Sequence, residues 1–83
     1  MGTGEKGKHR TADMYYAAYL KVCAVPFLGD EKEDGRVWFL FEDQGSKVMR
    51  DLKRQFFSGT AKVSALDLVQ AIKTMKQLTH LDD

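Results

Sequence analysis

The chain has 83 residues and a net charge of +1, from 13 Lys and Arg against 12 Asp and Glu. This length fits one small domain, and the near-zero charge excludes both a uniformly basic nucleic-acid protein and a strongly acidic tail. The single cysteine excludes an intrachain disulfide, and one Cys with two His argues against a structural zinc site of four protein ligands. Hydrophobic residues make up 43% of the chain, which argues against disorder throughout, and no apolar run reaches the roughly 18 residues of a membrane-spanning helix.

The first ten residues, MGTGEKGKHR, contain glycines and basic residues but no apolar residue after Met1. Such a segment has little surface to bury, so we predict a flexible basic tail over residues 1–10 and a single domain over residues 11–83. The tail lacks the apolar core of a secretory signal. Together with the lone Cys23, this favours a reducing, cytoplasmic location.

A first helix is predicted over residues 12–25, with Thr11 as its N-cap and Pro26 ending it. At about 100° per residue, its apolar and tyrosine side chains cover all but a narrow stripe around Asp13 and Lys21. A helix that is apolar on most sides is expected at the centre of a domain.

An Asp-Gly pair at residues 34–35 lies between two strand-like runs and predicts a β-hairpin with a type I′ turn, because both turn residues must accept positive φ. In this register Glu33 faces Arg36, an opposite-charge pair, and Leu28 faces Phe41.

The second arm of the hairpin is apolar on both faces, unlike the polar first arm. Such a strand needs cover on both faces, and a lone hairpin is only marginally stable. We therefore expect flanking helices, another strand, or a second subunit that pairs with its edge across a two-fold axis. The residues assigned to this core or dimer strand are Val37, Trp38, Phe39, Leu40 and Phe41.

Two further helices complete the predicted fold. The second runs from about 47 to 57, with Asp43 or Ser46 as its cap and Gly59 at its end; the third starts after Ser64 and runs to about residue 80. Whether residues 61–63 form a minor strand is left open. The sequence thus predicts a small α+β domain in the order α-β-β-α-α, with a β-hairpin and three helices.

No pattern in the chain predicts catalysis, a cofactor or a metal. Gly2 and Gly7-Lys8 match most of a phosphate-binding P-loop, but no strand precedes them and His9 stands where Ser or Thr is required. No histidine can be placed beside Cys23 as a base. We therefore expect a protein that is not an enzyme, with no cofactor, no small-molecule ligand and no membrane contact.

The charges are unevenly distributed along the chain. Residues 30–43 hold six acidic and two basic residues, whereas residues 44–81 hold seven basic and two acidic ones. Part of the positive charge lies on one face of the second helix and could meet nucleic-acid phosphates, with an aromatic ring beside it for stacking. The alternative is a solvated helix face. The candidate nucleic-acid-binding residues are Lys47, Arg50, Lys53, Arg54 and Phe57.

Several segments together resemble a known family: DMYYAAYLKV, GRVWFLFED, RQFFSG, AKVSALD and IKTMKQL, within about residues 11–80. The chain resembles small uncharacterised bacterial and phage proteins that share a domain of unknown function. The resemblance implies a bacterial or phage origin and no particular activity. Our first hypothesis is a non-catalytic interaction module that binds protein, as a homodimer; the alternative is a nucleic-acid-binding accessory protein that uses the basic helix face.

Overall fold

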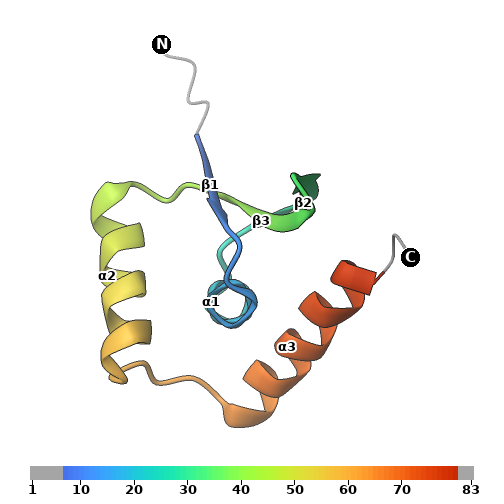
Figure 1. Ribbon diagram of the computed structural model, residues 1–83. Helices are drawn as coiled ribbons and strands as arrows, with labels where there is room; N and C mark the ends of the chain where they lie inside the picture. Colours follow the sequence, from blue (N-terminus) through green and yellow to red (C-terminus); the bar gives the residue numbers. More distant parts are fainter. Residues whose placement is uncertain (1–6, 81–83) are drawn as a thin grey trace.

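The computed structural model describes residues 7–80. It confirms a small α+β domain with a β-hairpin and three helices, and it adds one strand at the beginning (Figure 1). The elements in chain order are β1 (Lys8–Thr11), α1 (Met14–Val22), β2 (Phe27–Glu33), β3 (Arg36–Glu42), α2 (Ser46–Ser58) and α3 (Ala65–His80).

Strand β1 corrects the prediction of a tail that extends to residue 10. Residues 1–6 of that predicted tail lie outside the described part of the chain, but Lys8–Thr11 pair antiparallel with β3, from Lys8 opposite Glu42 to Thr11 opposite Phe39. The segment has no apolar side chain, so its composition gave no sign of order. Its order comes from backbone hydrogen bonds to a strand some thirty residues away.

The sheet has the order β1-β3-β2 and is antiparallel throughout, so the apolar strand β3 is its central strand. The predicted hairpin turn is confirmed, because Asp34 and Gly35 both have positive φ, 54° and 78°. Glu33 faces Arg36 as predicted.

The predicted pairing of Leu28 with Phe41 is wrong. A bulge between Phe27 and Gly29 shifts the register, and Phe27 lies opposite Phe41 instead. Gly29 has a φ of 130°, which a side chain rarely permits, and Leu28 is the extra residue, half exposed to solvent. The bulge therefore places the Phe27 ring 5.2 Å from that of Phe41, centroid to centroid.

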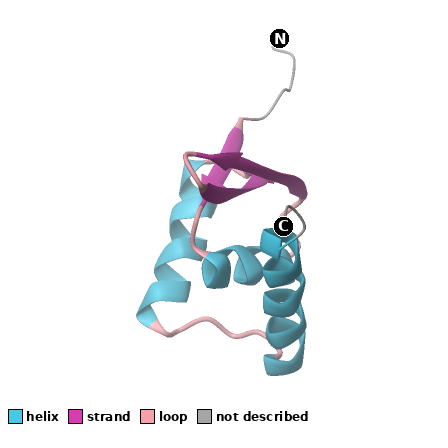
Figure 2. Ribbon diagram, turned by 45° about the vertical axis from the view of Figure 1, so that its right-hand side comes forward, coloured by secondary structure: helices cyan, strands magenta, loops and turns pink. Residues whose placement is uncertain are grey.

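Helix α1 is the centre of the domain, as its apolar surface predicted. It lies beneath the sheet, with α2 on one side and α3 on the other (Figures 1 and 2). The five consecutive residues from Tyr16 to Leu20 are all buried. Buried Met49 from α2 and buried Ala71 and Met75 from α3 belong to the same core.

The ends of α1 differ from the prediction. Asp13, not Thr11, is the N-cap: its Oδ1 accepts hydrogen bonds from the backbone N–H groups of Tyr15 and Tyr16 at 3.0 and 3.1 Å. The helix ends at Val22, because Ala24 takes a left-handed conformation with a φ of 65°. Pro26 therefore follows a helix that has already ended.

The loops around α2 and α3 agree with the prediction in part. Gly45 caps α2, and the Asp43 carboxylate accepts a hydrogen bond from its N–H, so neither Asp43 nor Ser46 is the cap residue. Gly59 ends α2 in the left-handed conformation, as predicted. The Ser64 hydroxyl accepts a hydrogen bond from the Asp67 N–H at 3.3 Å, and residues 61–63 form no strand.

Candidate functional site

The first candidate surface, strand 37–41, lies in the core of the sheet. Phe39 and Phe41 are buried, 1% and 0% exposed, among the residues of the hydrophobic core. Both edges of β3 are already paired, one with β1 and the other with β2. Of the three covers that the sequence left open for this strand, the structure shows another strand, β1, at the edge that a second subunit would have used. Self-association through a different surface stays a prediction.

On the other face of the sheet, Arg10 covers Trp38 in part. The Arg10 guanidinium lies 4.2 Å from the centroid of the Trp38 ring, which is a cation–π distance. Arg10 also forms ion pairs with Glu33 at 3.3 Å and Glu31 at 3.7 Å. Half-buried Trp38 and the arginine above it therefore connect all three strands.

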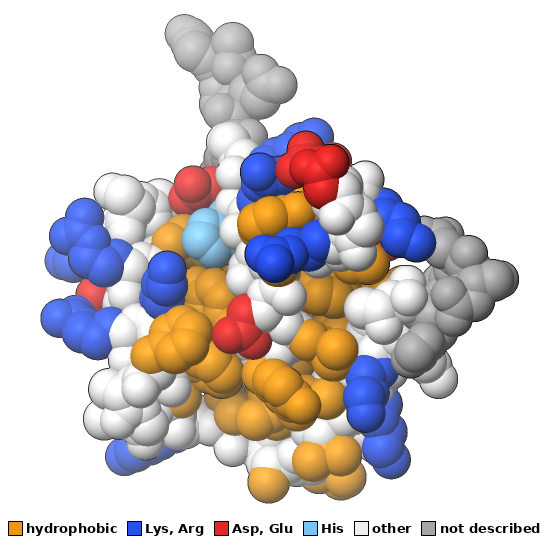
Figure 3. Space-filling model, in the orientation of Figure 1, with side chains coloured by type: hydrophobic (Ala, Val, Ile, Leu, Met, Phe, Trp, Pro, Cys, Tyr) orange, Lys and Arg blue, Asp and Glu red, His pale blue; other side chains and the backbone are white. Residues whose placement is uncertain are grey.

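The second candidate surface is the basic face of α2. Helical geometry separates this face from the side that packs on the core, where Met49 is buried and Leu52 and Phe56 are half-buried. Figure 3 shows Lys and Arg side chains along the outer side of α2, at the left of the view. The exposed residues of this basic face are Lys47, Arg50, Lys53 and Arg54.

Most of the positive charge on this face is not neutralised. Arg54 Nη2 lies 2.6 Å from Asp51 Oδ1, three residues earlier in the same helix. In the described part of the chain, Lys47, Arg50 and Lys53 form no ion pair. The structure therefore keeps three of the four predicted basic residues available to an anion.

Phe57 lies at the end of this face and is 59% exposed. Its ring is held from within by two others: the Tyr16 ring at 5.8 Å and 36° between planes, and the Phe56 ring at 4.9 Å in an edge-on arrangement. Tyr16 is itself only 2% exposed. The exposed ring therefore rests on a buried ring of the core.

His9 also belongs to this region, although the sequence predicted it to lie in the flexible tail. From β1, its ring meets the Tyr16 ring edge-on, with centroids 6.0 Å apart. Within residues 7–80, the His9 Nε2 and the Tyr16 hydroxyl are buried and have no hydrogen-bond partner. No local pattern could have indicated this contact, since β1 itself depends on long-range pairing.

Burial changes the ionisation of this cluster. Burial lowers the pKa of His9 below its ordinary value of 6.5; Asp43 opposes the shift and Lys53 adds to it. Burial also raises the pKa of Tyr16, and together with Cys23 and Tyr16 it raises the pKa of Tyr19 to about 12. These shifts favour the neutral forms of His9, Tyr16 and Tyr19 in the folded protein.

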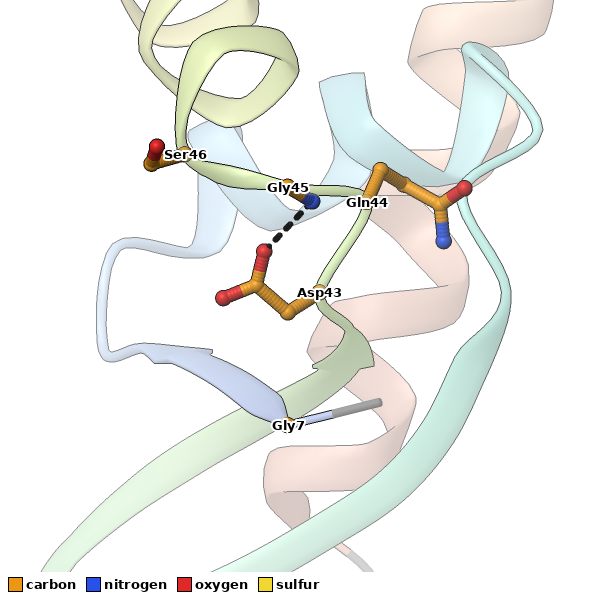
Figure 4. Close-up of a pocket in the computed structure, with 5 residues that line it drawn as sticks. All are labelled: Gly7, Asp43, Gln44, Gly45 and Ser46. Atoms are coloured by element: carbon orange, nitrogen blue, oxygen red, sulfur yellow. Dashed lines mark hydrogen bonds between the residues drawn. The ribbon is translucent and has the colours of Figure 1, made fainter. Parts of the chain in front are cut away.

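A hollow of about 390 Å³ lies at the start of α2, lined by Gly7, Asp43, Gln44, Gly45 and Ser46 (Figure 4). Of these residues only Asp43 has an acidic side chain, and its carboxylate accepts a hydrogen bond from the Gly45 N–H at 2.8 Å. The carboxylate thus already uses a donor at the positive end of the helix. Among residues 7–80, no group of three or more His, Cys, Asp or Glu is arranged to hold a metal ion.

Comparisons with protein-family models, with curated proteins and with solved structures found no match. The resemblance to small bacterial and phage proteins therefore stays a prediction. In the described part of the chain, no helix combines the length and the hydropathy needed to cross a bilayer.

Proposed function

We propose that this protein is a non-catalytic nucleic-acid-binding module that contacts phosphates through the basic face of α2. One observation carries the proposal: Lys47, Arg50 and Lys53 are exposed on a single helix, and none forms an ion pair within the described residues. A cation without a protein partner can release the counterions of a phosphate, which is the main source of affinity in sequence-independent binding.

The dimensions of this face suit a polyanion. Residues 47 to 54 extend over about 10 Å of helix at 1.5 Å per residue. The phosphates of one strand advance by about 3.4 Å each along a duplex axis, so the face spans about three of them. Four acidic residues lie together on the hairpin, at residues 30–34, whereas Asp43 precedes α2 and Asp51 is paired with Arg54 on it. The placement of these four on the hairpin, and not on α2, reduces repulsion between the protein and a nucleic acid bound at α2.

The test measures fluorescence anisotropy of labelled oligonucleotides at low salt. We expect wild type to bind and the pair Lys47→Gln and Arg50→Gln to lose about tenfold in affinity. The matched control is Lys73→Gln with Lys76→Gln, which removes the same charge from exposed positions on α3. Equal losses in both variants would show that net charge alone is responsible, and absence of binding by wild type would refute the proposal.

A second candidate function is protein binding by self-association, favoured by two exposed apolar residues on α3. Leu66 is 65% exposed and Val69 is 47% exposed, and their spacing of three residues places them on the same side of the helix. Sedimentation velocity up to high micromolar concentration tests it. Dimers that disappear in Leu66→Ser with Val69→Ser would support this function, and monomers throughout would refute it.

A further inference from the structure

We infer that Phe57 is a base-stacking residue and that the ligand of this surface is single-stranded nucleic acid. The inference rests on the proposed function, since the α2 cations would supply the phosphate contacts. Phosphate contacts alone do not distinguish a duplex from a single strand, because cations bind both. Stacking of a base on Phe57 would distinguish them.

Phe57 presents an aromatic ring to solvent at the end of the basic face. Burial of a phenylalanine side chain is favourable, yet this ring is 59% exposed while its neighbour Phe56 packs against the core. A flat apolar surface is thus left in water at the end of a row of cations. Base faces are the part of a nucleic acid that gains from contact with such a surface.

Two other aromatic rings support the Phe57 ring from beneath. Tyr16 and Phe56 contact Phe57 from the protein side, and Tyr16 is fixed in the core at 2% exposure. An orientation that exists before binding lowers the entropic cost of ordering the side chain in the complex. Phe57 therefore offers a preformed platform and not a mobile surface group.

Phe57 lies on the same side of α2 as two of the exposed cations. It follows Lys53 by four residues and Arg50 by seven, so all three side chains share one side of α2. A nucleotide whose base lies on the ring would have its phosphate beside Lys53. The next phosphate along the strand would lie nearer Arg50.

Base accessibility decides between single and double strands. In a duplex each base is stacked on its neighbours, and a side chain reaches a base face only by unstacking a step, which is energetically costly. In a single strand the base faces are available. The same protein should therefore bind a single strand more tightly than a duplex of equal length at equal salt.

The test compares a labelled 20-nucleotide oligo(dT) with a 20-base-pair duplex by anisotropy. Stacking on one base predicts that Phe57→Leu, which keeps an apolar side chain but removes the ring, loses about 5- to 100-fold in affinity for oligo(dT). Duplex affinity should change less than twofold. Phe57→Tyr should bind oligo(dT) like wild type. The control Leu28→Ala changes another half-exposed apolar residue, on β2, and should leave both affinities unchanged.

The outcomes separate the two proposals. If wild type binds both ligands and Phe57→Leu retains its affinity for oligo(dT), the stacking inference is overturned while the proposed function stands. Tighter binding of the duplex than of oligo(dT) would overturn it as well. If wild type binds neither ligand at low salt, the proposed function itself fails and the inference fails with it.

Discussion

The ring of Phe57 packs 5.8 Å from the ring of Tyr16, centroid to centroid, although Phe57 is 59% exposed and Tyr16 only 2%. This contact joins the proposed binding surface on α2 to the central helix. A change in the packing of Tyr16 should therefore affect both stability and the exposed ring.

Tyr16→Phe should stabilise the protein. The Tyr16 hydroxyl is buried and has no hydrogen-bond partner among the described residues, and such a group costs about 1–3 kcal/mol. Tyr19→Phe is the matched control, because the Tyr19 hydroxyl donates to Gln55 Oε1 at 3.3 Å and its loss should cost about 0.5–1.5 kcal/mol. Urea denaturation measures both variants. Destabilisation by Tyr16→Phe equal to that by Tyr19→Phe would contradict this account.

Stability should fall as the pH drops below about 6.5. Because burial lowers the pKa of His9 in the folded protein, the unfolded chain binds more protons once the pH is below the ordinary value of 6.5. The stabilisation is complete above 6.5 and is lost as the pH falls toward the lowered value. Urea midpoints measured from pH 8 to pH 5 test this. His9→Gln should show a shallower decline, and an unchanged decline would exclude His9 as its cause.

Alkaline conditions should also destabilise the fold. Burial raises the pKa of Tyr16, and that of Tyr19 to about 12, whereas tyrosines in the unfolded chain lose their protons near pH 10. Stability is therefore complete below pH 10 and declines as the pH rises toward 12. Absorbance at about 295 nm follows the tyrosinate form. Complete ionisation of all three tyrosines near pH 10 while the protein remains folded would contradict the prediction.

Ala24→Gly should stabilise the protein by about 1 kcal/mol. Ala24 ends α1 with a φ of 65°, a conformation that is costly for a residue with a side chain and favourable for glycine. Ala17→Gly is a control with the opposite expected effect. Ala17 is buried inside the same helix, so this change should lower the free energy of unfolding by about 1 kcal/mol or more. Thermal unfolding of both variants tests the pair. A lower melting temperature for Ala24→Gly would contradict the assignment of strain to this position.

Local features of the fold could be predicted from the sequence. The turn at residues 34–35 follows from two adjacent residues that accept positive φ, and Gly59 ends α2 for a similar reason. The central position of α1 follows from its nearly continuous apolar surface. The basic face of α2 follows from helical periodicity, which needs no tertiary information.

Long-range features could not be predicted. Strand β1 has no apolar side chain, and its order depends on pairing with β3, so the contact between His9 and Tyr16 also escaped prediction. The pairing of β2 with β3 departs from the predicted register at Leu28, because a bulge inserts this residue. Gly29 was the only local sign of the bulge in the sequence. Sequence periodicity identified the candidate cations, but only the structure shows which of them lack an ion pair.

The salt dependence of single-strand binding tests the central claim most directly. Three phosphate contacts, from Lys47, Arg50 and Lys53, predict that the logarithm of the oligo(dT) association constant falls with the logarithm of salt concentration with a slope of about −2. Removing two contacts in Lys47→Gln with Arg50→Gln should reduce that slope to about −0.7, while Lys73→Gln with Lys76→Gln should leave it near −2. A slope near zero for wild type, or the same slope in both double variants, would contradict binding through the basic face of α2.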